Sequence, residues 1–242
     1  MPCQICSATG HTADQCPQYQ GIHQSIRDFI DEILRTHPFS TAPARTSAQS
    51  LTDQFYCLYS GPVEWDLRES YGTTFGIAER VYLCVPPAHL DHVWALVKQN
   101  FTREKIASFK FAKVCTMQDA AKRRDTIVIY VARDGTRDVL HKLIALHTPS
   151  RARPGQRAPA PPLLKKEYFS DLVPRTTLPT PNLRGISAAD DPGPSVSYGG
   201  LICGALAEAH QGCDGTKWGF VRQVIATFGL KRISLTTPWK KL

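Results

Sequence analysis

Apolar residues recur at helical spacing in several segments of the chain. In residues 22–37 they return every three or four positions until Pro38, which predicts an amphipathic helix that ends before the proline. Residues 48–59 present a similar stripe, and another helix is expected from Pro87 to about Gln99. The same spacing predicts three further helices, over residues 136–147, 197–209 and 216–228.

Short runs of β-branched and aromatic residues predict three strands, over residues 80–85, 106–112 and 126–132. Residues 163–169 are a candidate for a short edge strand. The glycine- and aromatic-rich residues 61–77 predict an ordered loop, and the proline-rich residues 174–196 predict an extended loop across the surface. The pattern as a whole predicts an α+β fold, in which helices pack against a small mixed or antiparallel sheet.

The chain of 242 residues is long enough for one sizeable domain and a small appendage. We expect the appendage to comprise residues 1–18 and the large domain to comprise residues 19–242. Within the large domain, residues 148–162 are rich in proline and arginine and predict a mobile linker.

The appendage contains Cys3, Cys6, His11 and Cys16 at the spacing C-x2-C-x4-H-x4-C. Three thiolates and one imidazole can complete a tetrahedron around one Zn²⁺, whose binding energy folds so short a loop. Pro17 follows the last cysteine and is expected to stop the chain from continuing as a helix. This CCHC segment resembles the zinc knuckle of retroviral nucleocapsid and cellular RNA-binding proteins, and it predicts one structural zinc ion.

The side chains of the knuckle do not decide whether its partner is a nucleic acid or a protein. Knuckles that bind single-stranded nucleic acid usually offer an aromatic platform and basic residues. Here Gln4 follows the first cysteine, Ile5 is the only apolar side chain nearby, and residues 1–18 contain no lysine or arginine. Nucleic-acid binding would therefore need basic residues from elsewhere in the chain. Docking to a protein is the alternative.

Positive charge gathers in three segments of a chain whose net charge is +8. Residues 97–124 carry a large excess of lysine and arginine, and residues 151–166 and 217–242 carry basic residues with no acidic ones. Such clusters favour a phosphorylated peptide or protein, or a single-stranded nucleic acid, as partner. The alternative is that they are ordinary solvated surface charge.

The absence of two sequence features predicts an intracellular protein without a membrane partner. The N-terminus lacks the basic and apolar regions of a signal peptide, and no apolar run is long enough to cross a bilayer. The cysteines outside the knuckle are odd in number and widely spaced, which predicts reduced thiols in the core. They are Cys57, Cys84, Cys115, Cys203 and Cys213.

Residues 50–210 resemble the type III secretion effector family of phosphothreonine lyases, and more closely its branch of lyase components in class V lanthipeptide biosynthesis. The matching pieces occur in order along the chain. They are Phe55-Tyr56-x-x-Tyr59, the strand over residues 80–85, Phe109-Lys110, residues 124–131, Asp190-Asp191-Pro192 and Ser197-Tyr198-Gly199.

The resemblance implies β-elimination of phosphate from a phosphorylated serine or threonine, without a cofactor. Lys110 matches the position of the family's base, and Lys113 is a nearby second choice. Arg124, together with Arg123, matches the phosphate-binding arginine that opens the third strand. The cationic position two residues before the family's general acid is Arg80, and the acid itself is Tyr82 here. Arg80 and Lys113 are expected to bind the substrate phosphate together with Arg124 and Arg123.

Two departures from the family pattern keep a non-catalytic reading open. The family's acid is a histidine, whereas this chain has Tyr82, which can still donate a proton. Relatives also tend to place an arginine near the start of the helix that begins at Ser197, where this chain has Gly199 and Gly200. The alternative is therefore a zinc-knuckle protein that binds nucleic acid or a phosphorylated partner on a lapsed lyase scaffold.

Overall fold

The computed structural model divides the chain into two compact units, Met1–Tyr59 with Pro194–Leu242 and Ser60–Gly193. The structure describes residues 1–39, 47–60, 64–70, 76–101, 106–113, 124–133, 135–149, 162–172, 177–191, 193 and 197–240. The first unit is helical and the second contains a sheet with helices, so the predicted α+β class is confirmed.

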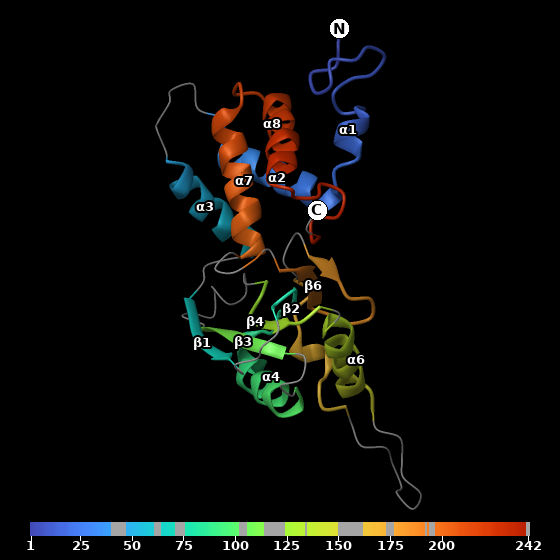
Figure 1. Ribbon diagram of the computed structural model, residues 1–242, viewed down its shortest axis with the longest axis vertical. Helices are drawn as coiled ribbons and strands as arrows, with labels where there is room; N and C mark the ends of the chain where they lie inside the picture. Colours follow the sequence, from blue (N-terminus) through green and yellow to red (C-terminus); the bar gives the residue numbers. More distant parts are fainter. Residues whose placement is uncertain are drawn as a thin grey trace, which may run out of the picture. The chain divides into compact units, whose positions relative to one another are not determined.

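The helices of the first unit share one apolar core (Figure 1). They are α1 (Pro17–Gln20), α2 (Gln24–Thr36), α3 (Ala48–Ser60), α7 (Tyr198–Gly212) and α8 (Lys217–Leu230). The predicted apolar stripes point into this core, where Phe29, Phe55 and Phe220 are fully buried. Side-chain caps begin the two C-terminal helices, because Ser197 Oγ accepts from the Gly200 amide and Thr216 Oγ1 from the Gly219 amide.

The second unit is built on an antiparallel sheet of six strands in the order β1-β3-β4-β2-β6-β5. The expected central strands are present as β2 (Glu79–Leu83), β3 (Ile106–Lys113) and β4 (Ile127–Val131). The other three strands are β1 (Glu64–Ser70), β5 (Leu178–Pro179) and β6 (Ile186–Asp190). Strand β4 lies between β3 and β2, so the three predicted strands are direct neighbours.

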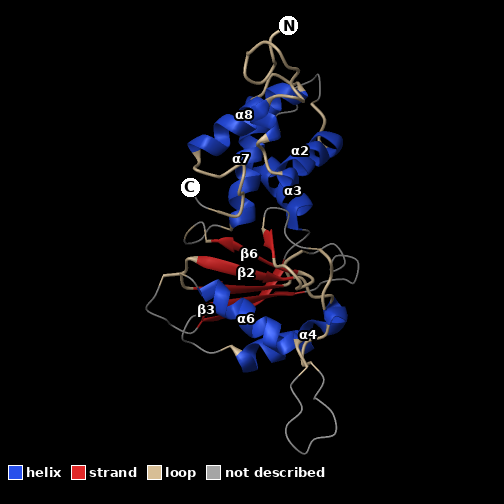
Figure 2. Cartoon of the chain, turned by 90° about the vertical axis from the view of Figure 1, so that its right-hand side faces the viewer, coloured by secondary structure: helices blue, strands red, loops and turns tan. Residues whose placement is uncertain are grey.

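Helices α4 (Pro87–Asn100) and α6 (Gly135–His147) cover one face of this sheet (Figure 2). Their apolar side chains, among them Val93 and Leu143, share a core with Leu83, Phe109 and Ile129 from the strands. Side chains alternate between the two faces of a strand. The residues between these apolar ones therefore point to the opposite face of the sheet.

Three predicted segments differ from the structure. Residues 61–77 contain strand β1, and residues 174–196 contain β5 and β6, where loops were expected. Long-range pairing explains this, because β6 is held along its length by β2 although its sequence, ISAAD, has little preference for a strand. Residues 163–169 form no described strand and include a 3-10 turn, η1 (Lys166–Tyr168).

Pro17 begins helix α1, and the expectation that it would stop a helix is therefore wrong. Proline is favoured at the first position of a helix, where its missing N–H has no partner to lose. Most of the predicted linker, residues 150–161, lies outside the described residues, as do residues 40–46. Each helix in the described part of the chain is too short or too polar to cross a membrane.

The cysteines outside the knuckle follow the prediction in part. All of those described are free thiols. Cys84 and Cys203 are buried, and burial raises the pKa of the Cys203 thiol well above its usual value. Cys57 is exposed rather than in the core, and Cys115 lies outside the described residues.

Candidate active site and metal centre

The sheet carries two rows of residues on the face opposite α4 and α6, which we call the polar face. In the first row, Lys110 of β3 and Tyr82 of β2 both pair with Val128 of β4, and Ser187 of β6 pairs with Tyr82. The second row contains Ser108, Tyr130, Arg80 and Ala189 in the same strand order. Directly paired residues point to the same face of a sheet. The register thus brings together Lys110, Tyr82 and Ser187, which are far apart in the sequence.

Lys110 and Tyr82 face each other across Val128. Each belongs to a strand next to β4, and neighbouring strands lie about 4.8 Å apart, so their Cα atoms are roughly 10 Å apart. Lys110 is half-buried and Tyr82 is buried. A small group placed over Val128 would lie between an amine and a phenol.

Tyr130 links the two rows. The Arg80 guanidinium carbon lies 4.9 Å from the centre of the Tyr130 ring, and the Lys110 ammonium nitrogen lies 5.8 Å from the same centre. Both distances fall within the range of cation–π attraction. The polar face thus has a cluster of two cations and an aromatic ring beside Tyr82.

Arg80 is held in place by Asp191, just after β6. Its Nε and Nη2 atoms both contact Asp191 Oδ1, and the Gly193 amide donates to Asp191 Oδ2 at 3.2 Å. Burial opposes the charge of the guanidinium, but the attraction of Tyr82, Tyr130 and Asp191 outweighs it and raises the pKa of Arg80. Arg80 therefore remains charged inside the protein.

Two serine hydroxyls on the polar face are buried without a hydrogen-bond partner in the described structure. They belong to Ser187, next to Tyr82, and Ser108, next to Tyr130, with exposed fractions of 0% and 1%. A buried hydroxyl without a partner costs roughly 1–3 kcal/mol. These two oxygens are thus unsatisfied polar groups beside the rows of Lys110 and Arg80.

The remaining predicted phosphate ligands lie toward the other end of the strands. Arg124 is half-buried and precedes β4, and Lys113 is the last residue of β3, where only its backbone is described. The row of Lys110 and Tyr82 lies between them and the row of Arg80 along the strands. Arg123 is outside the described residues. The roles of all these residues stay predictions.

The sequence reasoning missed Tyr130, Asp191, Ser108 and Ser187. Strand alternation could have found Ser108 and Tyr130. Ser108 is two residues from Lys110, and Tyr130 is two residues from Val128, so each pair shares one strand face. Ser187 carried no such signal, because its strand was not expected, and Asp191 had only its place in the matching piece Asp190-Asp191-Pro192. Strand β1 also brings Arg68 to the register position opposite Lys110.

The four predicted zinc ligands converge near the N-terminus. The Sγ atoms of Cys3, Cys6 and Cys16 and a ring nitrogen of His11 all lie within 4.8 Å of one another. A closed tetrahedron with Zn–S bonds of about 2.3 Å has S···S edges of about 3.8 Å. The cluster is therefore close to the size that zinc requires, and its three sulfurs and one nitrogen are a common donor set for structural zinc.

Local turns shape this metal site. The Cys3 amide donates to the Ala8 carbonyl at 2.8 Å, and the Ser7 amide donates to the Cys3 carbonyl at 2.9 Å. Ser7 and Gly10 have positive φ angles of 61° and 98°. Glycine adopts such angles readily, which explains the glycine before His11, whereas Ser7 adopts its angle at some cost.

The electrostatics of the site favour a thiolate at Cys3. Desolvation opposes its ionisation, but hydrogen bonds from the Cys6 and Ile5 amides and from the Cys6 and Cys16 thiols outweigh it. They lower the pKa of Cys3 to about 6. The thiolate is the form that binds metal.

Comparisons with known proteins bear on the fold. The structure is similar to that of the effector protein from Pseudomonas syringae pv. tomato strain DC3000, with a TM-score of 0.57 and 10% identity over 90% of this chain and 98% of that chain. The effector protein from Pseudomonas syringae pv. syringae strain 61 gives a TM-score of 0.49 and 9% identity, over 90% and 96% of the two chains. The sequence matches no protein-family model and no curated protein. The first likeness shows a shared fold alone.

Proposed function

We propose that the polar face of the second unit removes phosphate from a phosphorylated serine or threonine of a peptide or protein by β-elimination. The observation that carries this proposal is the first row of the sheet, where Lys110 and Tyr82 face each other across Val128. The resemblance of these same positions to the phosphothreonine lyases supports it. The fold shared with a Pseudomonas effector supports an effector-like protein.

In this reaction Lys110 acts as the base. Its neutral amine takes the α-proton of the substrate residue, and the electron pair of that C–H bond forms the Cα=Cβ double bond. The Cβ–O bond breaks and its electrons leave with the phosphate, to which Tyr82 donates a proton. The products are a dehydroamino acid and free phosphate. No water, metal ion or cofactor is consumed.

Positive charge is needed near the phosphate and the substrate carbonyl oxygen, because negative charge develops on both in the transition state. Burial and neighbouring positive charge also favour the neutral form of a lysine, which is the form that can act as a base. Asp191 holds the Arg80 guanidinium in a fixed position. We therefore assign Arg80 to stabilising the negative charge that develops during the reaction. Arg124, with Arg123 and Lys113, is the candidate for binding the phosphate itself.

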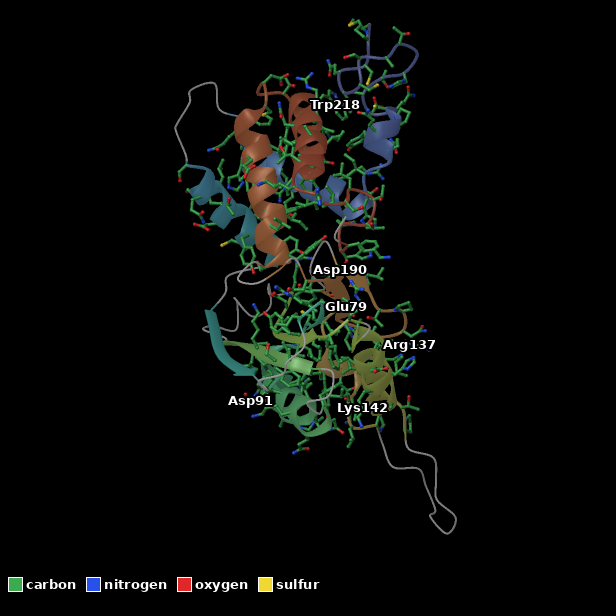
Figure 3. The ribbon with its side chains drawn as sticks, viewed as in Figure 1. Glu79, Asp91, Arg137, Lys142, Asp190 and Trp218 are labelled. Carbon is green, nitrogen blue, oxygen red and sulfur yellow. The ribbon has the colours of Figure 1, made fainter. Side chains whose placement is uncertain are left out.

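The test is the mass of phosphopeptides after incubation with the protein. Elimination removes the mass of phosphoric acid from the peptide, whereas hydrolysis would leave the serine or threonine intact. Lys110→Ala should lower the rate about 10²–10⁴-fold, which is the usual contribution of a general base. Lys142→Ala is the matched control, because Lys142 is an exposed lysine on α6, across the sheet from the polar face (Figure 3).

A non-catalytic binding protein is the second candidate. The ion pair between Arg80 and Asp191 favours it, since a guanidinium that is already paired is less available to a substrate. This candidate predicts that phosphopeptides bind to the protein but keep their mass. Elimination by the wild type that persists in Lys110→Ala would instead show that another residue is the base.

A further inference from the structure

The metal site has a structural partner inside the chain. We propose that zinc bound by Cys3, Cys6, His11 and Cys16 holds the knuckle, residues 1–18, in the apolar core of the first unit, and that zinc binding and the packing of helix α8 are thermodynamically coupled. The knuckle is then a part of the helical unit, and α8 of the same chain is what it binds.

The knuckle shares its apolar core with the helices. Cys3, Ile5, Ala13 and Cys16 are each at most 7% exposed. They belong to one apolar cluster with residues of α2 and α8, among them Ile26, Phe220, Val221 and Val224. Two of the four metal ligands are therefore also core residues of the helical unit.

Further contacts join the knuckle to the start of α8. The ring of Tyr19, in α1 just after Cys16, packs edge-on against Trp218, with ring centres 5.3 Å apart and an angle of 85°. Figure 3 shows Trp218 on α8, next to α1. Four residues further along α8, Arg222 Nη1 lies 3.5 Å from the Gln4 carbonyl oxygen. The α8 helix thus contacts the loop between the first two metal ligands and the helix that follows the last ligand.

The same packing removes the surface that a nucleobase would use. Ile5 is the apolar side chain beside the first ligands, and it is 6% exposed. Arg222, the cation that contacts the Gln4 carbonyl oxygen, is paired with Asp214 at 3.1 Å. The apolar side of the knuckle is therefore covered by the core of the helical unit, and α8 contacts the knuckle loop through Arg222.

Coupling follows from linkage. If bound zinc stabilises the docked knuckle, the docked knuckle must raise zinc affinity by the same factor. The short loop of residues 1–16 has turns but no helix or strand of its own, so it depends on metal or packing to keep its shape. Removing either one should weaken the other.

The first experiment measures hydrogen exchange along the full-length protein, prepared in the presence of zinc, in the wild type and in Cys6→Ser. We expect one zinc per chain in the wild type and its loss in the variant. Exchange in Lys217–Leu230 and Gln24–Thr36 should become about tenfold faster or more, while β2 and β4 of the other unit stay unchanged. Faster exchange confined to residues 1–16 would overturn the proposal.

The second experiment keeps all four ligands and changes the packing. Ile5→Ser should weaken zinc binding about tenfold or more in competition with a chelator, because burial of an isoleucine contributes on that scale. Gln4→Ser is the matched control, since Gln4 is exposed in the same loop, and its zinc affinity should equal that of the wild type. Equal affinity of the Ile5→Ser protein would also overturn the proposal.

Discussion

Arg80 shows how one residue can be both part of a site and part of the core. Its guanidinium lies over Tyr130 and is paired with Asp191, and the side chains of the pair are only 7% and 6% exposed. A buried charge that loses its partner is strongly destabilising, whereas the intact pair is near neutral in stability. The role of Asp191 is therefore to allow a charged arginine on the polar face.

This role leads to a prediction for Asp191→Asn. The substitution removes the charge of Asp191 from beside a buried, charged Arg80, so the free energy of unfolding should fall by about 2–4 kcal/mol. Urea unfolding followed by circular dichroism measures it. Asp171→Asn is the control, because Asp171 pairs with Arg184 on the surface, and its loss should cost less than about 1 kcal/mol. Equal losses in the two variants would contradict the assignment.

At the scale of elements, strand β6 depends on the loop that leads into it. Gly185 stands immediately before β6 with a φ of +65°, and its carbonyl accepts from the Cys84 amide at 2.7 Å. A Cβ atom at Gly185 would overlap the carbonyl oxygen of Ser170 and touch that of Cys84. The loop can thus approach β2 and its extension only with glycine at this position.

We expect Gly185→Ala to destabilise the protein by at least about 2 kcal/mol. The left-handed backbone angle and the overlap with backbone atoms each contribute about 1–2 kcal/mol or more. Thermal and urea unfolding measure this, and Gly76→Ala is the control, because nothing lies within 4 Å of a Cβ at Gly76. A Gly185→Ala protein as stable as the Gly76→Ala protein would show that the loop can relax.

At the scale of the whole molecule, the C-terminal basic cluster, residues 217–242, is less positive than its own sequence suggests, although that sequence contains no acidic residue. Three cations of the C-terminal cluster are paired with acids of the first unit. Lys217 contacts Asp31 at 2.8 Å, Arg222 contacts Asp214 at 3.1 Å, and Lys231 contacts Glu208 at 2.8 Å. Pairing reduces the field that a polyanion would sense.

Binding to a single-stranded RNA oligonucleotide tests this view. We expect a double variant, Lys217→Ala with Arg222→Ala, to bind RNA within about twofold of the wild type at any salt concentration between about 50 and 200 mM. Fluorescence anisotropy measures the affinity. A loss of tenfold or more, with a shallower dependence on salt, would mean that these cations contact phosphates and that the knuckle region binds nucleic acid.

The sequence by itself determined the features that depend on neighbours along the chain. The C-x2-C-x4-H-x4-C spacing identified four ligands that converge in space, and periodicity identified the long helices and strands β2, β3 and β4. Metal ligation within fourteen residues and the repeat of a helix or strand are local properties. Alternation along a strand likewise places Arg80 and Tyr82, which are two residues apart, on one face.

Only the tertiary structure decided what those residues meet. Three features join residues far apart in the sequence. They are the pairing of Lys110 and Tyr82 with the same valine, the ion pair of Arg80 with Asp191, and the burial of Ile5 in the core of the helical unit. Strands β1 and β6 likewise form because a neighbouring strand holds them, although their own residues gave no clear signal. Pairing and burial are set by long-range packing, which a local pattern does not encode.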